Sequence, residues 1–140
     1  MSGKAPYALD EQIGFILRQV YQRHASLFSD SFGEDFTPMQ WAVVAKLAEV
    51  GDCSQNMLGR HTAMDVATIK GVVERLMRRG LIETKSDAAD RRRLVVSLTA
   101  NGRAAFERWS GPAAHVSDET LAPLPPEDQQ TLLRLLTRLR

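Results

Sequence analysis

Basic side chains gather in the middle of this 140-residue chain, on a predicted helix over residues 65–79 and in the run 91–93. Guanidinium and ammonium groups donate hydrogen bonds to phosphate oxygens, and in the major groove of DNA they also donate to the O6 and N7 atoms of guanine. Acidic residues dominate the N-terminal third. The formal net charge of +1 does not by itself predict nucleic-acid binding. The concentration of basic residues in one region of the chain does predict a surface that binds nucleic acid.

The predicted helix over 65–79 has one apolar face, whose helical spacing predicts burial, and one polar face. A shorter helix ends near Met64, just before it. In such a pair, the N-terminal residues of the second helix meet base edges in the major groove. The alternative is a basic helix that is only solvated. The apolar residues are Ile69, Val72, Val73, Leu76 and Met77, and the expected DNA-reading residues are Val66, Ala67, Thr68, Lys70, Gly71 and Arg75.

Two apolar-rich runs, 81–85 and 94–98, follow this helix and are joined by a short polar link that suits only a hairpin tip. Two helices and a basic hairpin predict a winged helix-turn-helix. At the tip, we expect Arg92 to enter the minor groove while Asp90 holds its guanidinium in a bidentate pair. Arg91 and Arg93 would then face flanking phosphates. Alternatively, the three arginines are merely solvated.

Further phosphate contacts are expected from the start of the shorter helix, where side chains and backbone N–H groups can donate to an anion. Arg75 and Arg78, one and two turns along the second helix, are expected to meet phosphates of the DNA backbone rather than bases. The residues at the start of the shorter helix are Ser54, Gln55 and Asn56.

The remaining segments predict a mostly helical single domain over 1–140. Residues 1–8 predict a flexible arm, and Thr37 and Pro38 predict a capped helix that runs to Val50. Gly111 and Pro112 should kink or break the helix that Thr99 opens. The expected organisation is a winged helix-turn-helix lobe over 37–102, with dimerisation helices over 9–32 and 103–140.

Amphipathic helices at both ends of the chain need a partner surface, either within one subunit or in a second copy. The apolar residues of the first helix include Ile13, Leu17 and Val20, and the last helix is rich in leucine. We favour the second copy, because a DNA reader gains affinity and selectivity from two half-sites related by a two-fold axis.

Composition and scattered residue types exclude several classes of protein. With 44% hydrophobic and 25% charged residues, the chain is globular, and no apolar run approaches the ~20 residues that span a bilayer. It has no signal-type segment, so we expect a cytoplasmic protein without a membrane partner. The three histidines show no metal spacing and no nucleophile-and-base pattern, so we expect neither an enzyme, a metal nor a cofactor.

Cys53 is the single cysteine, and it precedes a predicted helix start whose dipole could lower the pKa of its thiol. A thiol-redox sensor is therefore an alternative, although a lone cysteine at a helix junction is more often inert.

In the order and spacing of its motifs the chain resembles the MarR (multiple antibiotic resistance regulator) family of bacterial transcription factors. The resemblance covers residues 9–140 and rests on three segments: 37–41, 68–82, and 90–102 with Asp90, Arg91 and Arg92 at its start. It implies a homodimer with interlocked terminal helices, two lobes on a palindromic operator, and release of DNA when a ligand binds. Gly111 and Pro112 depart from the family, in which this helix usually runs on unbroken.

The resemblance also implies an effector that is phenolic or an aromatic carboxylate, held between the DNA-binding lobe and the dimerising helices. Arg18 is then expected to clamp a carboxylate and Tyr21 to stack on the ring, while Trp41, His61 and Met64 line the same crevice. Alternatively, Trp41 and Met64 belong to the core and His61 to the surface.

From the sequence we expect a homodimeric transcriptional regulator that binds DNA and responds to a ligand. We favour a repressor. The alternatives are the redox sensor through Cys53 and a winged-helix module that binds proteins without touching DNA.

Overall fold

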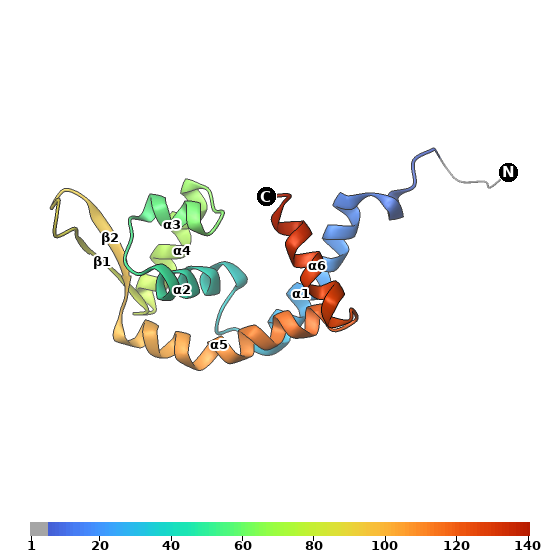
Figure 1. The fold of residues 1–140 in the computed structure, drawn as a ribbon. Coiled ribbons are helices and arrows are strands. Elements are labelled where there is room, and N and C mark those ends of the chain that lie inside the picture. The colour runs from blue at the N-terminus through green and yellow to red at the C-terminus, as the bar shows by residue number, and fades with distance from the viewer. Residues whose placement is uncertain (1–5) are drawn as a thin grey trace. The chain divides into compact units, whose positions relative to one another are not determined.

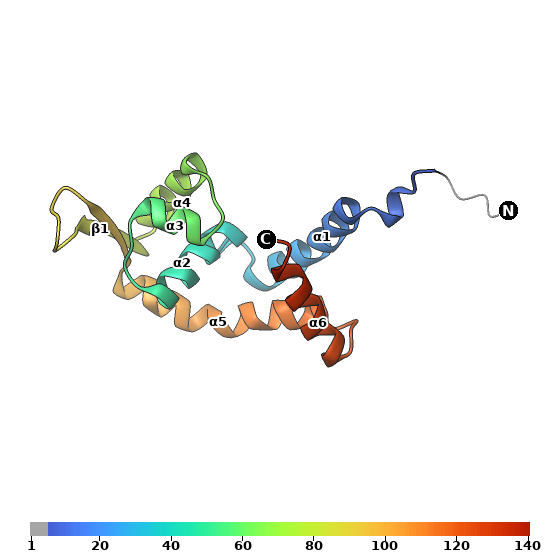
Figure 2. The ribbon, with the colours of Figure 1, turned by 45° about the horizontal axis from the view of Figure 1, so that its top comes forward.

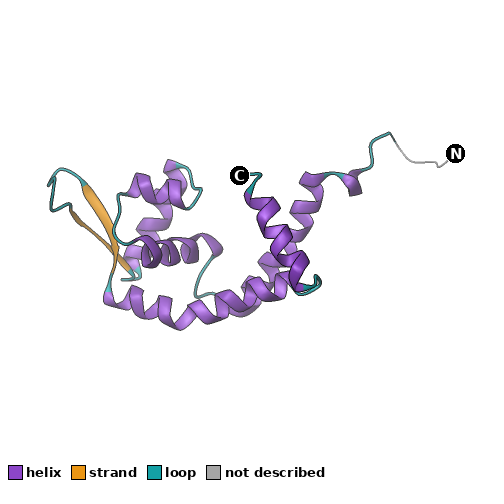
Figure 3. Ribbon diagram, in the orientation of Figure 1, coloured by secondary structure: helices purple, strands orange, loops and turns teal. Residues whose placement is uncertain are grey.

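Six α-helices, one short 3-10 helix and a two-stranded antiparallel sheet make up residues 6–140, the part of the chain that the computed structural model describes (Figures 1 and 3). The prediction of a mostly helical chain with a small β-hairpin is confirmed. Residues 1–5 of the predicted arm lie outside the described part. The elements in chain order are η1 (Leu9–Glu11), α1 (Ile13–Phe32), α2 (Pro38–Val50), α3 (Gln55–His61), α4 (Val66–Arg78), β1 (Ile82–Ser86), β2 (Leu94–Leu98), α5 (Ala100–Leu121) and α6 (Pro126–Thr137).

The chain packs into two compact units. The central unit is Phe32–Pro112, and the terminal unit combines the chain up to Ser31 with Ala113–Arg140. The predicted organisation, a single domain with a lobe over 37–102 and dimerisation helices on either side, stays a prediction.

Local side-chain chemistry sets the bounds of α2 as predicted. The Thr37 hydroxyl accepts a hydrogen bond from the backbone N–H of Gln40, and the Gln40 side chain accepts one from the N–H of Thr37, which completes a capping box. Pro38 occupies the first turn, where its missing N–H costs nothing. Gly51 ends the helix with a φ of 82°, a conformation that favours glycine.

The helices α2, α3 and α4 pack against one another and against the hairpin, and together they form the core of the central unit. The buried face of α4 consists of Ile69, Val72, Val73 and Leu76, as the periodicity predicted. α2 contributes Val43, Val44 and Leu47. Met77 was expected on the buried face but is 40% exposed, because it lies at the edge of the apolar stripe in the last turn.

A cluster of aromatic rings joins α5 to the start of the central unit. Trp109 stacks on Phe32 with ring centroids 5.0 Å apart, and Trp41 stacks on Phe106 at 5.8 Å. Phe36 packs edge-on to Phe32 at 6.2 Å. Offset and edge-to-face geometries of this kind add stability beyond the buried area.

The hairpin meets α5 through Thr99 and Gly102. The Thr99 hydroxyl donates to the carbonyl of Gly80 at 2.6 Å and accepts from the N–H of Gly102 at 3.0 Å, so it caps α5 and holds the end of α4. A Cβ atom at position 102 would overlap the backbone carbonyl oxygen of Leu81. Only glycine therefore allows α5 to approach the chain between α4 and β1 so closely.

Of the two outcomes expected at Gly111 and Pro112, a kink or a break, the break is wrong, because α5 is a single helix from Ala100 to Leu121 with Pro112 inside it. An interior proline removes one helical hydrogen bond and crowds the carbonyl four residues earlier. Contacts on both sides offset this cost. Trp109 is held in the aromatic cluster before the proline, and Val116 is buried after it.

In the terminal unit, α1 is tied to the C-terminal end of α5. The guanidinium of Arg23 donates to the carbonyls of Glu119 and Thr120, both at 2.7 Å, and so satisfies groups that the helix end leaves without partners. A cation at a helix C-terminus is also favoured by the helix dipole. His24 Nδ1 lies 2.8 Å from the Thr120 hydroxyl. Because that hydroxyl donates to Val116, Nδ1 must carry the proton.

Replacing Gly102 by alanine should lower the free energy of unfolding by about 2 kcal/mol, since backbone must move to admit the methyl group. Thermal unfolding followed by circular dichroism measures the change. Gly71→Ala is the matched control, because a Cβ there meets nothing within 4 Å. In the interior of α4 it should stabilise the free protein by about 0.5–1 kcal/mol. Equal stability of Gly102→Ala and the parent would contradict the close approach.

Candidate nucleic-acid interface

The helix α4 presents one face to solvent because its opposite face is buried. Val66 is 71% exposed, and Ala67, Lys70 and Arg75 are also exposed. Thr68 and Gly71 are half-buried, and the space beside Gly71 is open. All six residues expected to read DNA thus lie at least partly in solvent on one helix. Their contacts with DNA stay a prediction.

The N-terminus of α4 is fixed by Asp65. Its carboxylate accepts a hydrogen bond from the N–H of Thr68 at 2.7 Å, and this bond holds the pKa of the Asp65 carboxyl below its usual value. A lowered pKa means that the cap is complete above the unfolded-state value and is lost as the pH falls through the folded one. At neutral pH, Asp65 is therefore ionised and the start of α4 is ordered.

A tight turn sets the angle between α3 and α4, and the sequence reasoning missed the residue that allows it. A Cβ on Gly59 would lie 3.1 Å from the carbonyl oxygen of Met64 and 3.2 Å from Cγ2 of Ile69. The N–H of Met64 donates to the carbonyl of Gly59 at 2.9 Å, and Ala63 adopts a φ of 55°. A glycine inside a short helix was the available signal, since glycine is unfavourable there without a packing reason.

The expected phosphate ligands lie around the start of α3. The Ser54 hydroxyl accepts from the N–H of Met57 at 3.2 Å, and its own proton is left to donate outward. Asn56 is exposed and lines a hollow of about 370 Å³ shared with Arg60 and Val66, while Gln55 is half-buried. Arg78 is exposed at the far end of α4. Arg60 was not anticipated, although its position in the last turn of α3 places a cation beside the N-terminus of α4.

The wing is the β1–β2 hairpin, in which Ile82 pairs with Leu98 and Ser86 with Leu94. Its loop extends beyond the helices α2, α3 and α4 in both views of the ribbon (Figures 1 and 2). Near the loop end of β1, the Lys85 ammonium lies 3.1 Å from the Asp52 carboxylate. An isolated bridge between Cys53 and Val96 adds two further backbone hydrogen bonds.

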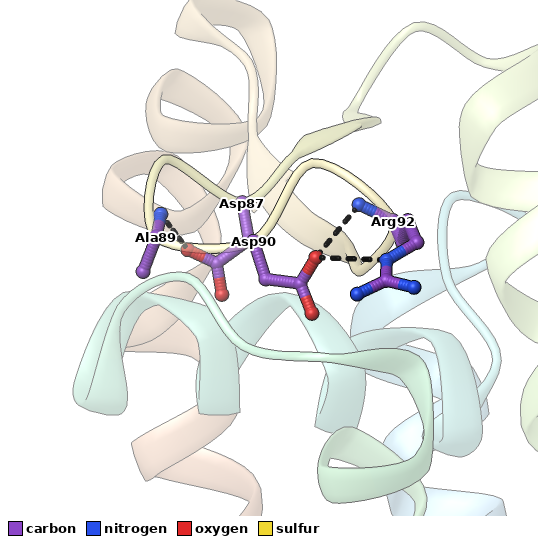
Figure 4. Close-up of polar contacts among 4 residues, drawn as sticks. All are labelled: Asp87, Ala89, Asp90 and Arg92. Atoms are coloured by element: carbon purple, nitrogen blue, oxygen red, sulfur yellow. Dashed lines mark hydrogen bonds and ion pairs between the residues drawn. The ribbon is translucent and has the colours of Figure 1, made fainter.

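At the tip, two aspartates order the backbone, as Figure 4 shows. Asp87 accepts from the N–H of Ala89 at 2.9 Å and Asp90 from the N–H of Arg92 at 3.0 Å. The expected bidentate pair is wrong, because only Nε of Arg92 approaches Asp90, at 3.7 Å, and it meets the oxygen that already accepts the backbone bond. The Arg92 side chain is 96% exposed, and Arg91 and Arg93 are exposed too.

Cys53 has a raised pKa, contrary to the lowering expected from a helix dipole. Burial disfavours the thiolate, and the charge of Asp52 raises the pKa further. Because the thiolate is the species that oxidants attack, this shift opposes the redox alternative.

The expected effector residues belong to different units. Arg18 and Tyr21 lie on α1 in the terminal unit, with the Arg18 guanidinium 5.7 Å from the Phe15 ring centroid and the Tyr21 ring 6.1 Å from His24. In the central unit, Trp41 is part of the aromatic cluster, Met64 lines the hollow beside α3, and His61 is exposed. A shared effector site stays a prediction.

Comparison with known proteins identifies the family. The family model described as MarR family matches residues 34–93, which hold the helix pair and most of the wing. The transcriptional repressor NicR of Pseudomonas putida is 35% identical over 135 residues, which cover 96% of this chain and 85% of NicR. The chain belongs to the MarR family.

Solved structures agree with this assignment. A probable transcriptional regulator from Pseudomonas aeruginosa is 54% identical, with a TM-score of 0.91 over 95% of this chain and 100% of that one. BpsR of Bordetella bronchiseptica, whose DNA binding is described as regulated by 6-hydroxynicotinic acid, is 36% identical, with a TM-score of 0.92 over 96% and 97%. The expected MarR fold and winged helix are confirmed.

The MarR family is one of transcription regulators, not a catalytic family. None of the helices within residues 6–140 is long and apolar enough to cross a membrane. In the same part of this MarR-family chain, no group of three or more His, Cys, Asp or Glu side chains is placed to hold a metal ion.

Arg92→Ala should weaken binding to an operator duplex, selected from a random library by the protein, by about 1 kcal/mol or more. It should also reduce the slope of log affinity against log salt by about one, because a cation near the DNA is lost. Fluorescence anisotropy over a salt series measures both quantities. Arg103→Ala is the control, since Arg103 is exposed on α5 outside the wing. Unchanged affinity and slope for Arg92→Ala would remove the wing from DNA binding.

Proposed function

We propose that this chain is a repressor that binds a palindromic operator as a homodimer and is released by a small aromatic effector, either phenolic or a carboxylate. NicR is named a repressor, and BpsR is a relative whose DNA binding responds to an aromatic acid. The activity requires no cofactor, and it takes place in the cytoplasm, where bacterial operator DNA lies.

The observation that carries the proposal is the polar face of α4, which is exposed together with an arginine-bearing wing in one unit. Lys70 and Arg75 can reach bases and phosphates from the helix, while Arg92 extends from the hairpin. Most of the binding free energy would come from phosphate neutralisation, and the N-terminal residues of α4 would supply the sequence preference.

The homodimer is supported by apolar side chains that the terminal unit leaves in solvent. Ile13 is 60% exposed on α1, and Leu133 and Leu139 are exposed on α6. Leu133 also lines a groove of about 270 Å³, together with Val20, His24 and other leucines of α5 and α6. Contiguous exposed apolar surface is costly in water and typically marks an interface. A second copy of the same unit fits, because a two-fold axis brings identical faces together. Two lobes would then meet half-sites about one helical turn apart, roughly 34 Å.

The effector role of Arg18 is supported by its surroundings. The guanidinium is exposed and lines a hollow of about 380 Å³ with Leu9, Gly14 and Phe15. A cation beside an aromatic ring suits a ligand that combines a carboxylate with a planar ring. Tyr21 lies one turn further along α1. Effector and operator would oppose each other through a coupling free energy of roughly 1–3 kcal/mol.

One experiment separates this function from a winged-helix module that binds only proteins. The purified chain should retard a random DNA duplex at low salt and should sediment at twice its mass of 15.6 kDa. Added salt should release the random duplex, because counterions compete for the phosphates. A chain that stays monomeric, or that ignores DNA at low salt, would refute the proposal.

Arg18→Ala should leave operator affinity unchanged but raise the concentration of 6-hydroxynicotinic acid needed for release by about tenfold, because a charge-assisted bond to the carboxylate is lost. Operator release is followed by anisotropy as the acid is titrated. Gln19→Ala, exposed on the same helix, is the control. If Arg18→Ala responds like the parent, Arg18 is not the clamp. If the parent itself ignores this acid, the same comparison applies to the aromatic acids that do release it.

A further inference from the structure

The central unit holds a pocket of about 310 Å³ that the proposed DNA and effector sites do not use. It lies where the first turns of α5 meet the end of α4 and the segment before α2. Two arginines, Arg79 and Arg108, line it together with Asn101, Asp35 and an apolar wall that includes Trp109.

Both arginines are held in place by aromatic rings. Cζ of Arg79 lies 4.7 Å from the ring centroid of Phe36, and its Nη1 donates to Oε1 of Gln40 at 3.3 Å. Cζ of Arg108 lies 5.4 Å from the ring centroid of Trp109. Neither guanidinium is in an ion pair with any described residue. Two pre-oriented cations without counterions therefore face one hollow.

We propose that this pocket is a binding site for a small planar carboxylate. Guanidinium groups match the two oxygens of a carboxylate, and their fixed geometry reduces the entropy lost on binding. The volume suits a single aromatic ring, which would lie against Trp109 and Leu81. Asn101 can donate a further hydrogen bond. The Asp35 carboxylate opposes the anion and limits its affinity.

The position of the pocket gives this binding a consequence for the proposed function, on which this step rests. Arg79 is the C-terminal cap of α4, and the carbonyl of Leu81 accepts from the N–H of Thr99 at the base of the wing. A ligand that draws Arg79 and Arg108 together acts on the recognition helix and on the wing at the same point. The site thus adds a second place at which an organic acid can alter DNA binding.

Binding is tested directly, without DNA, so that its failure is distinct from failure of the proposed function. The chain has two tryptophans, Trp41 and Trp109, and therefore gives two indole N–H signals in a ¹H–¹⁵N spectrum. A Trp41→Phe variant assigns them. Titration with benzoate should shift the Trp109 signal saturably, whereas benzamide, which has the same shape without the charge, should not.

Variants that remove a positive or a negative charge from the pocket identify the charges that act on benzoate. Arg108→Gln should weaken benzoate binding at Trp109 about tenfold, because one charge-assisted contact is lost. Asp35→Asn should tighten it, because a repulsive charge is removed. Arg103→Gln, exposed on the same helix outside the pocket, should bind as the parent does. Arg18→Gln should also leave the Trp109 titration unchanged, which separates this pocket from the proposed clamp.

The outcomes divide clearly. Saturable shifts that Arg108→Gln weakens and Asp35→Asn strengthens support the site. An absent shift, an equal response to benzamide, or equal affinity of the parent and Arg108→Gln overturns it. Operator binding by the same samples, measured in parallel, reports separately on the proposed function.

Discussion

Burial of the apolar face of α4 is the constraint on which the rest of the proposed DNA-binding surface depends. Ile69, Val73 and Leu76 are at most 2% exposed, so the helix cannot rotate about its axis without bringing them into water. Burying side chains of this size is worth roughly 1.5–3 kcal/mol each. The opposite face, with Lys70 and Arg75, is therefore held toward solvent by the core, whether or not DNA is present.

The wing is built on a different principle, because no core supports its tip. There the carboxylates of Asp87 and Asp90 hold the backbone by accepting from N–H groups two residues further on. This arrangement leaves the arginine side chains without a strong partner: the contact from Arg92 to Asp90 is long and shares an oxygen that is already engaged. Exposed pairs of this kind contribute little to stability. What the arrangement does achieve is a shaped loop whose cations remain available to an anion.

Local chemistry explains which parts of the fold could be predicted from the sequence. Thr37, Ser54 and Asp65 act on N–H groups three residues away, so the starts of α2, α3 and α4 follow from neighbouring residues alone. The hairpin follows in the same way from two apolar-rich runs joined by a polar link. The continuation of α5 through Pro112 was not predicted, because Trp109 is held by Phe32 and Phe36, which are distant in sequence.

The same limit applies to the candidate sites. The sequence pointed to the residues of α4 and the wing because charge and periodicity are visible in a single segment. It did not point to the pocket beside Arg79 and Arg108, since these arginines are 29 positions apart and the ring that supports Arg79, Phe36, comes from a third segment. Only the folded chain shows that the two cations share a hollow. The proposed effector residues Arg18 and Trp41 are harder to assign to one site, because they belong to different units.

A single junction connects these features. Thr99 caps α5 and bonds to Gly80, while Gly102 lets α5 lie against the carbonyl of Leu81. The end of the recognition helix, the base of the wing and the start of α5 are thus fixed to one another over a few residues. Close-packed backbone of this kind has little room to deform gradually, so a displacement of α5 would be passed to α4 and to the wing together. A ligand that moved α5 relative to α4 would therefore not need to touch the residues proposed to bind DNA in order to change their positions.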